Sequence, residues 1–210
     1  MEYRNHEVIA YVESITNPIL GEKRESFFPK LINSLELKTG VEVGVDKGGF
    51  SKCLLTGTTI EKFWCIDPWI DDFGSNHRPG YFDKSGDIRL NQAYQTLKSD
   101  VDKERAILVR ATGVEASKIV QNELDFVYID GDHSLEGIFN DLYSWVPKVK
   151  VGGIVAGHDY KNGPNSGMKD YFGNQLDFEV KTAVDFYCKK YGYKVFAVGP
   201  RVPSWYFVKV

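Results

Sequence analysis

Two short apolar segments, each ending in acidic residues and a histidine, most constrain what this chain can fold into. The first is DFVYIDGDH, residues 125–133, and the second is GGIVAGHDY, residues 152–160. Helix-like sequence separates them, so we expect two buried parallel strands joined by a crossover helix. Both polar ends would then lie at the sheet edge where open α/β sheets bind ligands. Because adjacent strands lie about 5 Å apart, Asp130 and Asp159 could converge on one cation, an arrangement that predicts an enzyme.

The rest of the chain alternates between strand-like and helix-like segments. Strands are expected at seven apolar runs, residues 41–45, 62–67, 106–111, 125–130, 152–159, 193–199 and 204–210. Helices are expected at residues 1–20, 27–37, 50–57, 88–100, 113–120, 134–149 and 178–192. This alternation predicts an α/β fold, a Rossmann-like doubly wound sheet that is mainly parallel with helices on both faces. The last two strands are joined by a short turn, so they must pair as an antiparallel C-terminal hairpin.

We expect residues 1–210 to form one domain, since a chain that is 42% hydrophobic can bury a full core. Residues 1–37 are expected to be an N-terminal helical extension. Two long segments, 68–86 and 160–176, are expected to be loops over the carboxyl edge, because each follows a strand. Their aromatic, glycine and asparagine residues suit a substrate lid, and variable surface insertions are the alternative.

Charge and hydropathy exclude several classes of function. The net charge of −3 and the pI near 5.8 give no basic surface for nucleic acid. No apolar run approaches the roughly 20 residues that span a bilayer, and the charged N-terminus lacks the apolar core of a signal peptide. Three cysteines in no paired pattern suit a reducing compartment. We therefore expect a cytoplasmic protein that binds neither nucleic acid nor membrane.

The glycine turn after the first strand, VEVGVDKGGFSKCLL, bears on the cofactor. It lacks the G-x-G-x-x-G spacing of dinucleotide sites, and its carboxylates, Glu42 and Asp46, would repel a pyrophosphate. They would instead attract an ammonium or sulfonium group. Asp67, at the end of the second strand, can accept both hydrogen bonds of a ribose diol. Together these features describe S-adenosylmethionine, although Gly44 and Gly48 could serve only a tight turn and Asp67 only a strand-end cap.

At this point the sequence resembles a known family. The residues that carry the resemblance are E-x-G-x-x-x-G-x-x-S at 42–51, IDPW at 66–69, and the DGDH and GGIVAGHD segments. They are similar to the class I S-adenosylmethionine-dependent methyltransferases, and within these to small-molecule O-methyltransferases with an I-D-G-x-H signature, including metal-dependent enzymes that methylate macrolide sugars. The resemblance covers residues 38–160. It implies methyl transfer to a hydroxyl of a small molecule, with a sugar-like acceptor favoured.

The resemblance implies cofactor-binding roles for Glu42, Gly44, Gly48, Asp67, Trp69, Thr112 and Asp130. Glu42 and Gly44 would approach the methionine portion, Gly48 would allow close backbone contact, and Asp67 would hold the ribose. Trp69 would border the adenine. Thr112 stands where the family often has an aspartate, and its hydroxyl would bond the adenine amino group.

The resemblance also implies a metal site and a base. Asp130 and Asp159 align with metal-binding carboxylates, with His158 as a further ligand, and His133 aligns with the general base. Oxygen ligands alone would favour Mg²⁺, whereas His158 would favour Mn²⁺ or another transition ion.

Structural roles compete with each of these assignments. His133 could merely cap a helix, and His158 could orient Asp159 by a hydrogen bond without binding the metal itself. Asp130 could serve only the methionine end of the cofactor, with no metal. Asp132 is expected to cap the helix at 134–149, with Ser134 as the competing cap.

Two other functions stay open on the sequence. A nicotinamide-dependent oxidoreductase is disfavoured by the acidic glycine turn. A non-catalytic nucleoside-binding module would bind the cofactor without turnover. The N-terminal helices are amphipathic enough for a homo-oligomer contact.

Overall fold

The computed structural model describes residues 22–70, 85–169 and 175–210 of the chain. Its helices are α2 (Arg24–Ser34), α3 (Gly49–Gly57), α4 (Gly86–Val101), α5 (Gly113–Ser117), α6 (Leu135–Trp145) and α7 (Val180–Tyr191), with a 3₁₀ turn at Val146–Lys148. The strands are β1 (Thr39–Val43), β2 (Lys62–Asp67), β3 (Ala106–Arg110), β4 (Leu124–Ile129), β5 (Val149–Gly157), β6 (Gly163–Lys169), β7 (Gln175–Phe178), β8 (Phe196–Val198) and β9 (Ser204–Val208).

Seven of these strands form one sheet in the order β3-β2-β1-β4-β5-β9-β8. Strands β1 to β5 pair in parallel, and β9 pairs antiparallel with both β5 and β8. The predicted fold class is therefore confirmed, including the antiparallel C-terminal pair. The strand order reverses between β1 and β4, so that ligands are expected at the carboxyl ends of these two strands.

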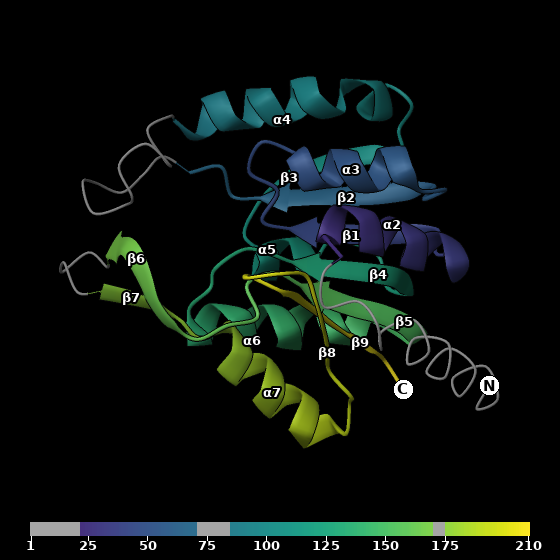
Figure 1. Ribbon diagram of the computed structural model, residues 1–210. Coiled ribbons are helices and arrows are strands. Elements are labelled where there is room, and N and C mark those ends of the chain that lie inside the picture. The colour runs from purple at the N-terminus through teal and green to yellow at the C-terminus, as the bar shows by residue number, and fades with distance from the viewer. Residues whose placement is uncertain (1–21, 71–84, 170–174) are drawn as a thin grey trace.

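Helices cover both faces of the sheet (Figure 1). One apolar cluster joins α2, α3 and α4 to the sheet, and the other joins α5, α6 and α7 to the opposite face. Along β9, Trp205 and Phe207 belong to the second cluster and Tyr206 and Val208 to the first. This alternation is the period-two pattern of a strand that is buried on both faces.

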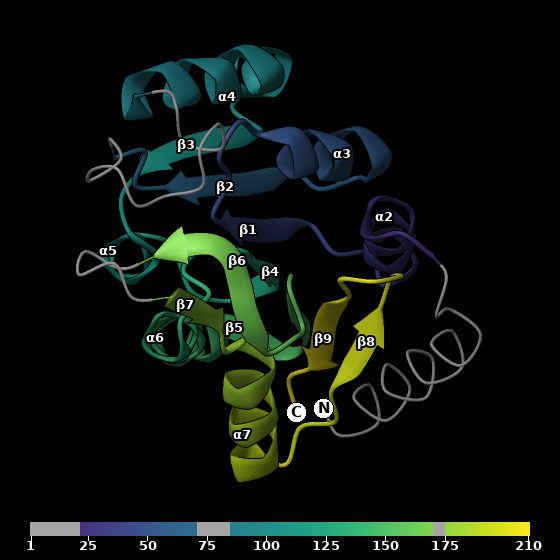
Figure 2. The ribbon, with the colours of Figure 1, turned by 60° about the vertical axis from the view of Figure 1, so that its left-hand side comes forward.

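The structure differs from the expected local structure on either side of Phe178. Part of the segment expected to be a loop at 160–176 is a two-stranded antiparallel hairpin, β6–β7, which projects beyond the carboxyl edge (Figures 1 and 2). Because Phe178 ends β7, the next helix begins at Val180 rather than at 178. The helix expected at 1–20 and most of the loop expected at 68–86 lie outside the described residues. Within the described ranges, no helix is both long and apolar enough to cross a membrane.

Candidate functional site

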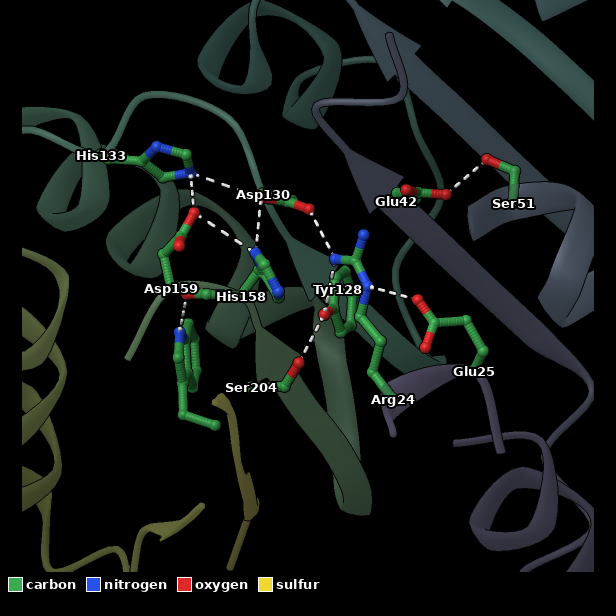
Figure 3. Close-up of polar contacts among 11 residues, drawn as sticks. Arg24, Glu25, Glu42, Ser51, Tyr128, Asp130, His133, His158, Asp159 and Ser204 are labelled. Carbon is green, nitrogen blue, oxygen red and sulfur yellow. Dashed lines mark hydrogen bonds and ion pairs between the residues drawn. The ribbon is translucent and has the colours of Figure 1, made fainter. Parts of the chain in front are cut away.

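Four acidic and histidine side chains meet where β4 and β5 end (Figure 3). The His133 Nε2 atom lies 3.3 Å from Asp130 Oδ1 and 3.4 Å from Asp159 Oδ2. The His158 Nδ1 atom lies 3.3 Å from Asp159 Oδ2 and 3.7 Å from Asp130 Oδ1. The parallel pairing of β4 with β5 brings the residues together, as the sequence predicts. We call Asp130, His133, His158 and Asp159 the acid–histidine cluster.

Three members of the cluster have the geometry of a metal-binding set. Asp130, His133 and Asp159 each offer one ligand atom, and these atoms lie within 4.8 Å of one another. A set of two carboxylates and an imidazole suits a divalent transition ion such as Mn²⁺. The sequence predicts His158 as a ligand and His133 as the base. His158 Nδ1 lies nearly as close to the two carboxylates as His133 Nε2 does, so the ligand role of His158 stays a prediction.

Contacts with aromatic residues position the His133 ring and the His158 backbone. The His133 ring stacks on Phe178, with ring centroids 5.0 Å apart. The Trp205 indole donates to the His158 backbone carbonyl at 3.1 Å. Neither histidine caps α6, since the cap is Ser134, whose hydroxyl accepts from the Gly137 amide at 3.1 Å. The expectation that Asp132 caps this helix is wrong, because its carboxylate accepts from the Ser134 amide in the preceding turn.

The electrostatics of the cluster couple its acids to its bases. The pKa of His133 is raised. Burial alone would lower it, but the hydrogen bond to Asp130 and the charges of Asp130 and Asp159 outweigh the effect of burial. Burial raises the pKa of Asp159, but the hydrogen bond from His158 and the charges of both histidines outweigh it, and the pKa is lowered. The charged forms of the carboxylates and of the His133 imidazole therefore stabilise one another within the cluster.

The glycine turn brings β1 against the end of β4. Gly44 has φ +91°, and a Cβ there would lie 2.0 Å from the Asp130 carbonyl oxygen. Gly48 has φ +80° and precedes the first residue of α3. Both positions favour glycine, Gly44 because the turn packs against the Asp130 backbone and Gly48 because its backbone is left-handed.

Glu42 is buried beneath this turn, with 2% of its surface exposed. Burial raises the pKa of its carboxyl to about 8, and a hydrogen bond with the Ser51 hydroxyl partly opposes that rise. Glu42 is therefore largely protonated at neutral pH, so it would offer a ligand a hydrogen-bonding group rather than a full charge.

Asp67 joins the glycine turn to the end of β2. Its Oδ2 accepts from the Asp46 amide at 2.9 Å, and its Oδ1 accepts from the Trp69 amide at 2.8 Å. Burial raises the pKa of this carboxyl. Each carboxylate oxygen has a second lone pair, so the strand-end cap leaves acceptors for a diol.

Two expected adenine contacts do not fit the packing. The Trp69 side chain is 0% exposed within the core on the α3 and α4 face, and its indole nitrogen donates to the Asp46 carbonyl at 2.7 Å. Its ring therefore cannot border a ligand. Thr112 is exposed but caps α5, where its hydroxyl lies 2.8 Å from a Glu115 carboxylate oxygen and accepts from the Glu115 amide. That capping box engages the hydroxyl expected to bond adenine.

Sequence reasoning missed one side chain at the site, Arg24, from the first turn of α2. Its Nη1 donates to Asp130 Oδ2 at 2.8 Å and to the Tyr128 hydroxyl at 3.1 Å. The contact spans 106 residues of sequence, and no local pattern marks it. The only available signal is a cation near the start of an expected helix.

A cavity of about 140 Å³ adjoins the cluster. It lies between the start of α2 and the β8–β9 turn, and it is lined by Lys23, Arg24, Glu25, His158, Val198, Gly199, Pro200, Val202 and Ser204. His158 is the member of the cluster that lines this cavity, so a molecule bound there would lie beside His158.

Solved structures with this fold include methyltransferases. An O-methyltransferase from Bacillus cereus, in complex with S-adenosylhomocysteine (SAH), has a TM-score of 0.62 at 12% identity, covering 99% of this chain and 91% of that one. A caffeoyl-CoA O-methyltransferase candidate from Staphylococcus aureus gives 0.63 at 14% identity, covering 97% and 91%. An rRNA methylase from Streptococcus thermophilus gives 0.57 at 13% identity, covering 89% and 93%. At these identities the likeness concerns the fold.

No curated protein matches the sequence. Residues 41–160, which run from β1 past the acid–histidine cluster, match the family described as "Methyltransferase domain". That match covers more than half of the chain and includes both the glycine turn and the cluster. The chain therefore belongs to this methyltransferase domain family.

Proposed function

We propose that this protein transfers a methyl group from S-adenosylmethionine to a hydroxyl of a small, sugar-like molecule, assisted by a divalent cation. One observation carries the proposal. The glycine turn with Asp67 and the acid–histidine cluster lie at the same sheet edge, and Gly44 packs directly against the Asp130 backbone. A methyl donor at the turn and a hydroxyl at the cluster would therefore be neighbours.

Methyl transfer needs a deprotonated or polarised hydroxyl in line with the carbon–sulfur bond. The acceptor oxygen attacks the methyl carbon, the carbon–sulfur bond breaks, and SAH leaves as a neutral thioether. Holding the two reactants in line supplies much of the acceleration. A divalent cation would lower the pKa of the hydroxyl and fix its direction of attack.

The geometry favours different roles for the two histidines. Both histidines lie beside the two carboxylates, but the three-residue metal set includes His133 and the residues that line the cavity include His158. We therefore propose His133 as the ligand and His158 as the group that accepts the hydroxyl proton, the reverse of the roles implied by resemblance. General base catalysis of this kind is typically worth about 10²–10⁴-fold in rate.

Calorimetric titration with SAH tests the donor site. We expect binding that Asp67→Ala weakens more than about tenfold, because the diol would lose two hydrogen bonds. Asp102→Ala, which removes an exposed carboxylate at the end of α4, should leave the affinity unchanged. No binding by the unaltered protein would remove the proposal. If only amine, catechol or RNA acceptors were methylated in a screened panel, the proposed sugar-like hydroxyl acceptor would be wrong.

The histidine roles are tested by pairing Mn²⁺ titration with turnover. His133→Gln should weaken Mn²⁺ binding by about tenfold or more, the loss typical of an altered metal shell. His158→Gln should keep the metal affinity and lose about 10²-fold or more in kcat. The opposite pattern would restore the roles expected from resemblance. Unchanged turnover in both variants would contradict the proposed roles of both histidines.

A further inference from the structure

The Arg24 guanidinium enters the site from α2 and is held on three sides. Its Nη1 atom bonds Asp130 and Tyr128, and its Nε atom lies 3.3 Å from Glu25 Oε1. The guanidinium carbon lies 4.5 Å from the centre of the Phe50 ring, at the start of α3. A guanidinium fixed by stacking and by bonds on two nitrogens presents its third nitrogen in a set direction.

That third nitrogen, Nη2, has no hydrogen-bond partner among the residues that the structure describes. Figure 3 shows it on the side of the guanidinium that faces Glu42. The Arg24 side chain is 22% exposed, and Nη2 is not among the buried polar side-chain atoms that lack a hydrogen-bond partner in the described part of the chain. The nitrogen therefore points toward the end of β1, beside the glycine turn that packs against the Asp130 backbone.

The charged and polar groups around Arg24 Nη2 suit an amino-acid zwitterion. Asp130 supplies a carboxylate, and buried Glu42 supplies a hydrogen-bonding group, both of which suit an ammonium. The Arg24 guanidinium supplies a cation, and with Nη1 and Nε already engaged its Nη2 can donate a charge-assisted hydrogen bond to one oxygen of a carboxylate. S-adenosylmethionine carries both groups at its methionine end.

We propose that Arg24 binds the methionine carboxylate of the cofactor through Nη2 while it holds Asp130 through Nη1. This inference rests on the proposed function, since it assumes that S-adenosylmethionine binds at the glycine turn. It assigns a cofactor-binding residue outside the matched region 41–160. The same contact would place the donor beside Asp130, so that α2 links the donor site to the acid–histidine cluster.

The test compares two ligands that share the nucleoside and the thioether but differ in the amino-acid group. SAH has the carboxylate, and 5′-methylthioadenosine lacks it. Affinities for both are measured by calorimetry on the full chain and on Arg24→Gln, Arg24→Lys and Lys30→Gln. Lys30 is the matched control, since it is an exposed cation of the same helix that pairs with Glu22.

We expect Arg24→Gln to weaken SAH binding by about ten- to hundredfold, the loss of a charge-assisted hydrogen bond, and to leave 5′-methylthioadenosine unaffected. Arg24→Lys should fall between, and Lys30→Gln should match the unaltered protein. Equal weakening of both ligands by Arg24→Gln would overturn the proposal, because it would indicate a general collapse of the site. Unchanged SAH affinity would also overturn the proposal, and Nη2 would then be a candidate contact for an acidic methyl acceptor. Failure of the unaltered protein to bind SAH is a separate result that removes the proposed function itself.

Discussion

The buried acid of the site, Glu42, gives a prediction about pH. Its folded pKa of about 8 lies above the ordinary glutamate value near 4.3, so the folded protein holds a proton that the unfolded chain releases. This contribution to stability is complete below about pH 4 and is lost as pH rises through about 8. Glu42→Gln removes the titration and keeps an acceptor for Ser51. Relative to the variant, the unaltered protein should therefore lose unfolding free energy between pH 5 and pH 8.5.

Urea unfolding of both proteins without ligand, at pH 5, 6.5 and 8.5, measures this difference. Each unit by which the two pKa values differ is worth about 1.4 kcal/mol, so a gap of more than 1 kcal/mol should open across the range. Other titrating groups are common to both proteins and cancel. A gap that stays constant with pH would mean that Glu42 titrates alike in the folded and unfolded chains.

At the same scale, the sequence could predict which acids and histidines gather but not what each one does. Asp130 and Asp159 follow adjacent strands, and strand order alone brings them together. Whether His133 or His158 joins them depends on side-chain directions that no spacing encodes. The burial of Trp69 and the engagement of Thr112 in its capping box depend on packing and on local hydrogen bonds. Arg24 reaches Asp130 only because α2 crosses above β4.

At the scale of elements, segments with a strong hydrophobic pattern could be assigned as helix or strand from the sequence, whereas segments without such a pattern could not. The buried strands are continuous apolar runs, and their positions along the chain and the mainly parallel sheet could be predicted from the alternation with helices. The hairpin β6–β7 was missed because GPNSGMK, its first strand, has neither an apolar run nor strict alternation. Glycine, proline and asparagine predict loops from composition. Local propensity was overridden here by the pairing of Gly163 with Phe178 and Pro164 with Asp177.

At the scale of the whole molecule, the two-faced core depends on its last strand. β9 lies inside the sheet between β5 and β8, although it ends near the C-terminus. Its four apolar side chains, Trp205 to Val208, are at most 4% exposed and are shared between the two apolar clusters. We therefore expect both layers of the core to depend on β9.

Removal of residues 204–210 should accordingly abolish the folded state and not leave a smaller folded domain. Each large apolar side chain in β9 contributes about 1.5–3 kcal/mol by burial, and together they approach the 5–15 kcal/mol by which domains are typically stable. We expect the truncated chain to show no cooperative transition in thermal unfolding followed by circular dichroism. Removal of Val210 alone, which is 50% exposed, should leave the transition in place. A truncated chain that still unfolds cooperatively would mean that β1 to β5 form a stable sheet without the hairpin, and the carboxyl edge would then not need Trp205 behind His158.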